Sequence, residues 1–362
     1  MALTDVQKRM MAKLNELDGA VKYDFNPFAN GIEMPTPSLG FILGNTWLIP
    51  QGYTVLLAGM PKAGKSIIIS AIEGLMHRQD EDAVTVKVNT EMRESVQVTP
   101  AQMRLWGIDR DRRIVWEVRE PSNIFDRAEQ EIPKLCQAGV KVKLFIIDSL
   151  QDILGRRQMN ADSVDQQQIA DKAATIQDGL SRIKGMLRRY GVTTVLTSQV
   201  RAEMDQLEIR RGNKIRMATS FAVKHMAEYY LMVENYRNKD GKTDLAGNTF
   251  EDNSIQGLDG ESDTAAHKLR ITCLDNSLDR PGRVAICTLH HDLGFIHQHE
   301  EVFLLGVGMQ VIGQEKQGYY TYGDRSWHGK GAILEAIQQE PELFAAIVRD
   351  CKMKDLIRTR GV

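Results

Sequence analysis

The chain has 362 residues, of which 42% are hydrophobic and 26% charged, and its net charge is −2. This composition is ordinary for a globular protein and excludes a disordered chain, while no apolar run reaches the roughly 18–20 residues that a membrane-spanning helix needs. The four cysteines have no metal-binding spacing, so we expect reduced thiols and a cytoplasmic location without membrane contact. Because the whole molecule does not attract polyanions, any binding of nucleic acid requires a local cluster of Lys and Arg.

The chain begins with a predicted helical arm and continues into an alternating body. Residues 1–34 combine an amphipathic helix with a polar connector that runs from Asp24 to Pro37. The body alternates short apolar runs with segments of helical period, which is typical of a mostly parallel sheet with crossover helices. The first predicted strands are Tyr53–Ala58, Ala83–Val88, Arg113–Val118, Lys143–Ile147, Val192–Thr197 and Tyr229–Val233. The predicted helices between them are Lys65–His77, Thr99–Trp106, Ile124–Cys136 and about Gln166–Arg189.

The last third of the chain has a different organisation. Residues 238–264 are polar and rich in Gly, Asp and Asn, which predicts a surface insertion between two strands. The strands Lys268–Leu274 and Arg283–Leu289 follow, and the helices Ala332–Gln339 and Glu342–Cys351 end the chain. We therefore predict an α/β fold with an arm at 1–34, a core with a mostly parallel central sheet at 35–294, and a small C-terminal α/β module at 295–362.

A phosphate-binding loop is predicted at the end of the first strand of the body. The sequence there fits G-x-x-x-x-G-K-[ST] and lies between a strand and a helix, the context in which this pattern binds nucleotide phosphates. Lys65 is expected to reach the β- and γ-phosphates and Ser66 to bind Mg²⁺, so ATP and Mg²⁺ are the predicted ligands. The residues expected to contact ATP here are Gly59, Met60, Pro61, Lys62, Ala63, Gly64, Lys65, Ser66 and Ile67.

Three other polar residues follow apolar strands. Asp148 ends the run KLFIID, the form of a Walker B strand, and is predicted to hold Mg²⁺. Glu91 follows the next strand after the phosphate-binding loop; it is either a carboxylate that orients the attacking water or a solvated acid at a strand end. Gln199 ends the strand TTVLTSQ, where its amide can bond the γ-phosphate or simply cap the strand.

Together these motifs resemble the RecA-type recombinases, and especially their phage branch, UvsX. The stretch from Asn89 to Asp109 resembles that family's D-[AS]-E strand and its TPAYLR…GVD segment, and Phe145–Leu150 is similar to its FIDSL strand. The segments Gly318–Tyr322 and Gly329–Gly331 resemble the GAWYSY…GQGKA stretch of the bacterial protein's C-terminal region. The resemblance runs from about Ile32 to the C-terminus, apart from residues 238–264.

The resemblance implies a RecA-like P-loop core and a DNA-dependent ATPase. Such a protein forms helical filaments on single-stranded DNA and promotes homologous pairing and strand exchange with duplex DNA in recombination and repair. Glu91 then becomes the catalytic glutamate, acting with Lys65, and Gln199 couples the γ-phosphate to DNA binding. The arm at residues 2–30 packs on a neighbouring subunit of the filament. Mediator and single-strand-binding proteins are further implied partners, and a phage-encoded protein would work in the host cytoplasm.

The sequence also departs from the family pattern. The Asp that precedes the catalytic glutamate in the family is Asn89 here, and Gln102 occupies the position of an adenine-stacking tyrosine, so Gln102 is the expected neighbour of the base. The Lys-x-Lys pair that reaches a neighbour's ATP in the bacterial protein is replaced by Asp275-Asn276-Ser277. Arg280 and Arg283 are close enough to substitute as arginine fingers, or they are ordinary turn residues beside Pro281-Gly282.

Two basic segments occupy the family positions of the DNA-binding loops. One follows Asp148 and the other follows Gln199, and paired Arg side chains in them can grip phosphates without regard to sequence, although short basic runs are often only solvated loops. The candidate DNA-binding residues are Arg156, Arg157, Met159, Arg201, Arg210, Arg211, Lys214 and Arg216.

Two other functions fit the same core. One is a hexameric RecA-core helicase or translocase, and the other is an ATP-regulated DNA-annealing or assembly protein that does not exchange strands. The arm, core and small C-terminal module together favour the recombinase.

Overall fold

The computed structural model describes most of the predicted core and C-terminal module. The described residues are 31–44, 47–94, 98–155, 167–202, 215–217, 221–236, 266–290, 292–316 and 318–360. Most of the predicted arm and the predicted insertion at 238–264 therefore lie outside them.

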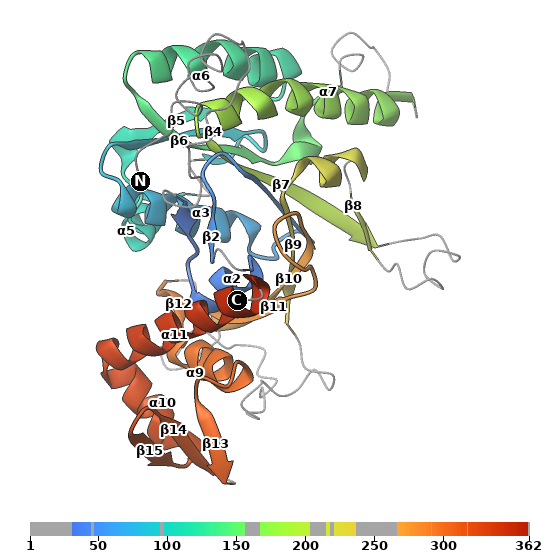
Figure 1. Cartoon of the computed structure of the whole chain (residues 1–362). Helices are drawn as coiled ribbons and strands as arrows, with labels where there is room; N and C mark the ends of the chain where they lie inside the picture. The colour runs from blue at the N-terminus through green and yellow to red at the C-terminus, as the bar shows by residue number, and fades with distance from the viewer. Residues whose placement is uncertain are drawn as a thin grey trace, which may run out of the picture.

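A ten-stranded mixed sheet dominates the described part of the chain (Figure 1). Its strands follow the order β12-β11-β10-β9-β3-β7-β6-β4-β5, and β8 pairs with β7. The strands from β9 to β5 are parallel, whereas β10, β11 and β12 extend the sheet beyond β9 through antiparallel pairings only. The bounds are β3 Thr54–Gly59, β4 Ala83–Asn89, β5 Arg113–Trp116, β6 Lys141–Asp148, β7 Thr193–Ala202, β8 Ile215–Met217, β9 Tyr229–Asn235, β10 Ala266–Asn276, β11 Val284–His290 and β12 Gly294–Ile296.

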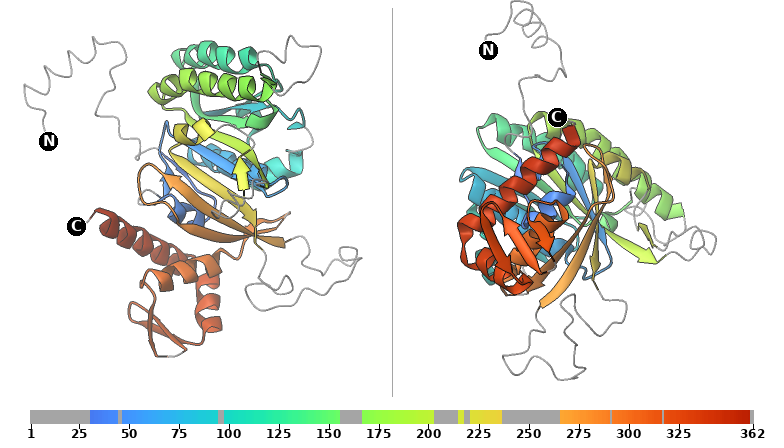
Figure 2. Two further views of the ribbon diagram at one scale, coloured as in Figure 1. Left: turned by 90° about the vertical axis from the view of Figure 1, so that its right-hand side faces the viewer. Right: turned by 60° about the horizontal axis from the view of Figure 1, so that its bottom comes forward.

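Helices cover both faces of this sheet because its central strands are apolar on both sides. Val55 and Leu57 of β3 belong to one buried cluster, and the alternating Leu56 and Ala58 belong to another. The helices α6 and α7 pack together on the second cluster, and α3 and α5 pack on the first (Figures 1 and 2). The bounds are α3 Lys65–Gln79, α5 Pro100–Trp106, α6 Arg127–Gln137 and α7 Gln167–Arg189. Shorter helical segments are η1 Arg110–Arg112, η2 Ser122–Asp126, η3 Leu150–Asp152 and η5 Phe221–Met226.

Every strand predicted from the apolar runs is present, and so is every predicted helix of the core. The fold class, an α/β chain with a large and mostly parallel central sheet, is therefore confirmed. The predicted polar connector is wrong at its end, since β1 at Ile32–Glu33 pairs with β2 at Leu48–Ile49 and the helix α2 begins at Pro37 and ends at Ile42. Thr36 caps this helix by accepting a hydrogen bond from the Leu39 backbone N–H.

The C-terminal residues form a smaller group of elements around a second site of apolar packing, which also includes Trp47 of the core. The strands β13, β14 and β15 form an antiparallel sheet, against which three helices lie (Figure 1). The bounds are α9 Gln298–Gly308, β13 Gly313–Lys316, β14 Tyr319–Tyr322, β15 Arg325–His328, α10 Lys330–Gln339 and α11 Pro341–Arg360. Both predicted helices are present, but α11 ends at Arg360 rather than at Cys351, and α9 and the three strands were not predicted.

The last helix ties this group back to the core. Trp47 belongs to the same hydrophobic cluster as Phe303 and Ile347, and its indole Nε1 donates to Asp355 Oδ2 at 2.8 Å. The same oxygen accepts from Arg283 Nη1 at 2.6 Å, and Asp355 is buried. The contact between α11 and the core thus includes a buried, hydrogen-bonded ion pair. No helix in the described ranges combines the length and the apolar character that crossing a lipid bilayer requires.

Helix α3 passes close to the end of α5, which makes one glycine of the phosphate-loop helix irreplaceable. A Cβ atom on Gly74 would lie 1.8 Å from the Trp106 carbonyl oxygen, a backbone atom that no side-chain rotation can move. We predict that Gly74→Ala lowers the free energy of unfolding by about 1–3 kcal/mol, as overpacking does elsewhere. Urea denaturation followed by circular dichroism measures this change.

Gly185 provides the control for this substitution. It is also helical, in α7, but a Cβ atom there would meet nothing within 4 Å. Gly185→Ala should therefore raise the free energy of unfolding by roughly 0.5–1 kcal/mol through helix propensity alone. Equal effects of the two substitutions would contradict the close approach of α3 and α5.

Candidate nucleotide-binding site

The predicted phosphate-binding loop joins β3 to α3 in a conformation that depends on its glycines. Gly64 is the N-cap of α3 and has a φ of 91°, in the left-handed region that favours glycine. A Cβ atom on Gly59 would lie 2.4 Å from the Val233 carbonyl oxygen of the neighbouring strand β9. Backbone N–H groups at the start of α3 and the helix dipole favour an anion at this point. Met60, Pro61 and Lys62 of the loop are exposed, whereas Ala63 is buried and Ile67 packs against the core.

The side chain of Lys65 is bound to the backbone of the phosphate-binding loop. Its side chain is buried, and Nζ donates to the carbonyl oxygens of Gly59 and Met60, each at 2.9 Å. Burial lowers the pKa of Lys65, while the nearby carboxylates of Asp148 and Glu91 oppose this shift. The ammonium group therefore lies near Asp148 and Glu91, the two carboxylates predicted from the sequence to act at this site. A bound phosphate would take the place of the two carbonyl oxygens as its hydrogen-bond acceptor.

A chain of hydrogen bonds places Asp148 beside the loop. Asp148 ends β6 and is only 2% exposed, and its two carboxylate oxygens accept from different neighbours. Ser66 Oγ donates to Asp148 Oδ2 at 3.0 Å, and Thr197 Oγ1 of β7 donates to Asp148 Oδ1 at 2.6 Å. A serine hydroxyl beside a carboxylate at the end of a phosphate-binding loop is the oxygen donor set that Mg²⁺ takes in nucleotide sites. The two predicted metal ligands, Ser66 and Asp148, thus lie together, and Thr197 is a supporting residue that sequence reasoning missed.

Glu91 lies at the same edge of the sheet. The sheet register pairs Asn89 of β4 with Asp148 of β6, so Glu91 follows directly beyond the strand end. Burial raises the pKa of Glu91, with further contributions from the negative charges of Asp148 and Asp152. The Thr90 hydroxyl, between Asn89 and Glu91, donates to the Ser149 carbonyl oxygen at 2.6 Å and accepts from the Ser149 N–H at 2.7 Å. The end of β4 is therefore fixed to the end of β6, and a half-buried carboxylate projects from it.

Gln199 occupies the equivalent place on β7. Its register partner on β3 is Gly59, the first residue of the phosphate-binding loop. The Gln199 backbone N–H donates to Gln151 Oε1 at 3.0 Å, which ties β7 to the turn after Asp148. The structure therefore brings Lys65, Ser66, Asp148, Glu91 and Gln199 to the carboxyl ends of adjacent parallel strands, where open α/β sheets bind ligands.

Gln102, the predicted neighbour of the base, is hydrogen-bonded to Thr99 at the start of α5. Its side-chain Oε1 accepts from the Thr99 N–H at 3.1 Å while its own N–H donates to Thr99 Oγ1 at 3.3 Å. These two bonds form a capping box at the start of α5. The amide thus stabilises a helix end, and Gln102 would have to give up this cap to bind a base.

The two candidate arginine fingers differ sharply. Arg280 is exposed, and its backbone N–H donates to Asp279 Oδ1 at 2.7 Å. Arg283 is 15% exposed, and its guanidinium binds Asp279 and Asp355 and the Phe41 carbonyl oxygen while lying over the Phe41 ring. This geometry opposes the expectation that Arg283 reaches a neighbouring subunit, because its donors are already used inside the chain.

Most of the candidate DNA-binding residues lie outside the described residues. These are Arg156, Arg157, Met159, Arg210, Arg211 and Lys214. Arg201 is exposed near the end of β7, and the register of β7 and β8 pairs it with Arg216. The strands β7 and β8 extend away from the rest of the sheet (Figures 1 and 2).

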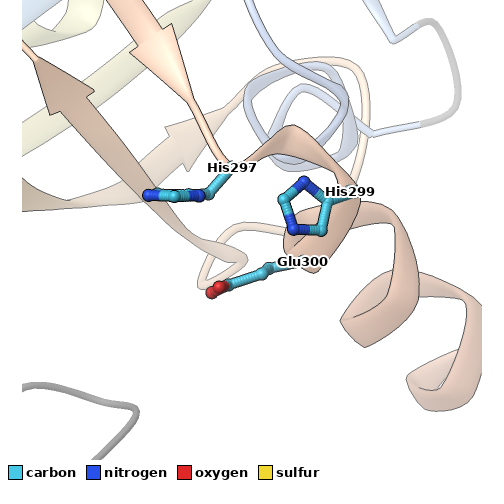
Figure 3. Close-up of side chains that lie close together, drawn as sticks. All are labelled: His297, His299 and Glu300. Atoms are coloured by element: carbon cyan, nitrogen blue, oxygen red, sulfur yellow. The ribbon is translucent and has the colours of Figure 1, made fainter. Parts of the chain in front are cut away.

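A second group of chemically reactive residues lies away from this edge of the sheet. His297, His299 and Glu300 are neighbours at the start of α9 (Figure 3), and their ligand atoms lie within 4.8 Å of one another. His297 is the N-cap of α9, and His299 and Glu300 lie in its first turn, so their closeness in the chain accounts for their proximity. The helix N-terminus also disfavours a cation. We assign no metal to this group.

The comparisons with known proteins point to the same family as the motifs. No protein-family model matches the chain. The RecA protein of Mycoplasma genitalium is 22% identical over 342 residues, which cover 92% of this chain and 89% of that protein. The RecA protein of Mycoplasma pneumoniae is 23% identical over 94% of this chain, and that of Staphylococcus epidermidis is 20% identical over 84% of it. This chain is similar to RecA proteins over most of its length. The similarity supports a RecA-type recombinase.

The support of Asp148 by Thr197 can be tested through Mg²⁺. We predict that Thr197→Val raises the Mg²⁺ concentration needed for half-maximal thermal stabilisation by ADP about 10-fold, as loss of a residue that orients a metal ligand typically does. The matched control is Thr194→Val on the same strand, because Thr194 pairs with Phe145 and not with the Asp148 end of β6. An unchanged Mg²⁺ requirement in the Thr197 variant would contradict the role assigned to this hydroxyl.

Proposed function

We propose that this protein is a DNA-dependent ATPase that assembles on single-stranded DNA and pairs it with homologous duplex DNA. The observation that carries the proposal is the convergence of Lys65, Ser66, Asp148 and Glu91 at one edge of the parallel sheet, in a chain similar to RecA proteins over 92% of its length. Residues 318–331 resemble the C-terminal region of the bacterial recombinase, which favours the recombinase over a helicase with the same core. The resemblance to the UvsX branch, and with it a phage origin, stays a prediction.

The residues at this edge of the sheet have different roles in ATP binding and hydrolysis. The loop backbone and Lys65 bind the phosphates, and Ser66 and Asp148 hold Mg²⁺, which when bound neutralises phosphate charge and orients the γ-phosphate. Glu91 accepts a proton from the attacking water and directs it at the γ-phosphate. Its half-buried position suits this role, because a carboxylate with a raised pKa is a stronger base than an exposed one.

We further propose that Gln199 transmits the state of the nucleotide to DNA. Gln199 lies two residues before Arg201 on β7, and the strand leads to the basic segment that contains Arg210 and Arg211. A hydrogen bond between Gln199 and the γ-phosphate would be lost on hydrolysis, and the position of the strand end would change with it. The segments around Arg156, Arg157 and Met159 and around Lys214 and Arg216 would complete the DNA-binding surface.

The three-part organisation belongs to the same proposal. Residues 1–34 would form the arm that packs on a neighbouring subunit of a filament, 35–294 the ATPase core, and 295–362 the C-terminal module. A separate hydrophobic cluster, which includes Phe303 and Ile347, supports the last part. In such a filament Arg280 is the better candidate to reach a neighbour's ATP, since it is exposed and Arg283 is not. Mediator and single-strand-binding proteins would be further partners, in the cytoplasm where the DNA is.

Electron microscopy with single-stranded DNA and a non-hydrolysable ATP analogue tests the assembly. A helical filament is the expected result. Closed hexameric rings that unwind a forked duplex would instead identify a helicase. With ATP in place of the analogue, assembly that does not change between wild type and a Glu91→Gln variant would indicate a protein that binds ATP without using its hydrolysis.

Glu91→Gln should abolish turnover but not binding. We predict that the rate of ATP hydrolysis in the presence of single-stranded DNA falls about 10²–10⁴-fold, the usual contribution of a positioned base, while ADP affinity is retained. In the wild type the rate should fall as the pH drops through the raised pKa of Glu91, because only the ionised carboxylate accepts a proton. Glu131→Gln, which removes a partly exposed acid of α6, is the control and should hydrolyse ATP normally. Full activity of the Glu91 variant would refute the assignment.

Changing Arg210 and Arg211 together to Ala tests the DNA-binding segment. We predict that single-stranded DNA no longer stimulates ATP hydrolysis, because two phosphate-binding groups are lost, while nucleotide binding is unaffected. Arg349→Ala, at an exposed position of α11, is the control for loss of positive charge. Stimulation that persists at full strength would show that this segment does not bind DNA.

A further inference from the structure

A buried network of charged side chains lies next to the turn that carries Glu91. Arg113 of β5 makes a bidentate pair with Glu73 of α3, at 2.7 and 3.2 Å, and also binds Glu94 at 2.7 Å. Lys87 of β4 binds the other oxygen of Glu94 at 2.8 Å. The exposed fractions of the side chains are 2% for Lys87, 1% for Glu73, 3% for Arg113 and 12% for Glu94. Two positive and two negative charges thus balance each other in a largely buried position.

Asn89 connects this network to Glu91. Its side-chain Nδ2 donates to Glu94 Oε2 at 3.2 Å, and its Oδ1 accepts from the Glu91 backbone N–H at 3.1 Å. The second bond closes a turn of the kind that Asn forms with the residue two positions later. Asn89 itself is fully buried, and its partners Glu91 and Glu94 are partly buried, which limits the competition of water for both bonds. A continuous path therefore runs from the phosphate-loop helix α3, through Glu73, Arg113, Glu94 and Asn89, to the backbone of Glu91.

The chemistry of this path requires an amide at position 89. An amide offers one donor and one acceptor, which the carboxylate of Glu94 and the N–H of Glu91 respectively use. An aspartate at this position could accept from Glu91 but could not donate to Glu94, and the two carboxylates would repel each other. The family pattern has Asp at this position, and here the adjoining Glu94 explains why this chain has Asn.

We propose that Asn89 and Glu94 are positioning residues that fix Glu91 at the edge of the nucleotide site. The proposal rests on the proposed role of Glu91 as the base in ATP hydrolysis. Neither residue touches the nucleotide in this scheme. Lys87 and Arg113 orient the carboxylate of Glu94, and Glu94 in turn orients the amide of Asn89, which bonds the Glu91 backbone. The Glu73–Arg113 pair connects this network to α3, the helix that begins at Lys65. A displacement of a reacting group by about 1 Å costs on the order of 100-fold in rate, so the network is a sizeable contributor to turnover.

A reciprocal pair of substitutions tests this proposal. Asn89→Asp removes the donor to Glu94, and Glu94→Gln turns an amide N–H toward one of the three donors, Lys87, Asn89 and Arg113, from which the carboxylate accepts. Each substitution thus creates a donor–acceptor mismatch in the network and changes its charge by one unit. The double variant restores both, because the new carboxylate at 89 can accept from the new amide at 94 and still accept from the Glu91 N–H, and the total charge returns to its original value. Each single variant should lower kcat for ATP hydrolysis about 10–100-fold with ADP affinity within about 2-fold of wild type, and the double variant should recover most of the loss.

The matched control is Gln339→Glu. Gln339 also donates to a glutamate, Glu335, at 3.0 Å, but this pair is exposed and lies on α10 of the C-terminal group. It should leave kcat unchanged. Circular dichroism and thermal denaturation establish that each variant is folded. Should a single variant fail to fold, the double variant, with its charge restored, must still fold and hydrolyse ATP.

The outcomes separate this inference from the function on which it rests. A wild-type chain that does not hydrolyse ATP would overturn both proposals. Active wild type together with folded single variants of normal kcat would overturn only the positioning role. Impaired single variants whose double variant is no better than either would also overturn it, since the loss would then not arise from the pairing of Asn89 with Glu94.

Discussion

The carboxylate of Asp148 is the constraint on which the rest of the site depends. A buried carboxylate without partners is costly, and a side chain that is 2% exposed cannot rely on water. Asp148 is stabilised by hydroxyl groups of Ser66 and Thr197 and by the nearby positive charge of Lys65. Two of these three groups belong to the phosphate-binding loop. The interactions that make Asp148 tolerable in the folded chain are therefore the same ones that assemble the site, and the loop, β6 and β7 cannot be positioned independently.

The parallel arrangement of the strands extends this constraint along the edge of the sheet. In parallel strands all carboxyl ends lie at the same edge of the sheet, so the residues that follow β3, β4, β6 and β7 lie close together without long loops to bring them there. The strand register then sets the position of each residue along the strand direction: Gly59 pairs with Gln199, and Asn89 pairs with Asp148. The fixed link between Thr90 and Ser149 and the charged network around Glu94 add lateral restraints to the end of β4. Glu91 thus projects from a strand end held on two sides.

Much of this could be predicted from the sequence, because the signals are local. Apolar runs such as Lys143–Ile147 are buried on both faces and read directly as central strands, and the phosphate-binding loop is a contiguous motif. The parts that were missed depend on distant residues. The sequence of α9 contains the apolar run VFLLGV, which suits a strand as well as a helix, and contacts with Trp47 and α11 decide its form. Its acidic first turn, Glu300 and Glu301, was the local sign of a helix. Thr197, Glu94 and Arg113 belong to no sequence motif. Their contacts depend on how the strands pair, which the sequence alone does not show.

The turn between β10 and β11 shows how tertiary structure separates residues that look equivalent in sequence. Arg280 and Arg283 flank the same Pro-Gly pair, and nothing local distinguishes them. Arg283 neutralises Asp279 and Asp355, whose side chains are 7% and 2% exposed, and moving it to another subunit would leave both charges buried. Breaking such a buried pair costs about 3–5 kcal/mol, which a contact with a neighbour's phosphate would first have to repay. Arg280 carries no such penalty. The anchored arginine fixes the turn to α2 and α11, and that anchoring presents the exposed arginine in a defined place.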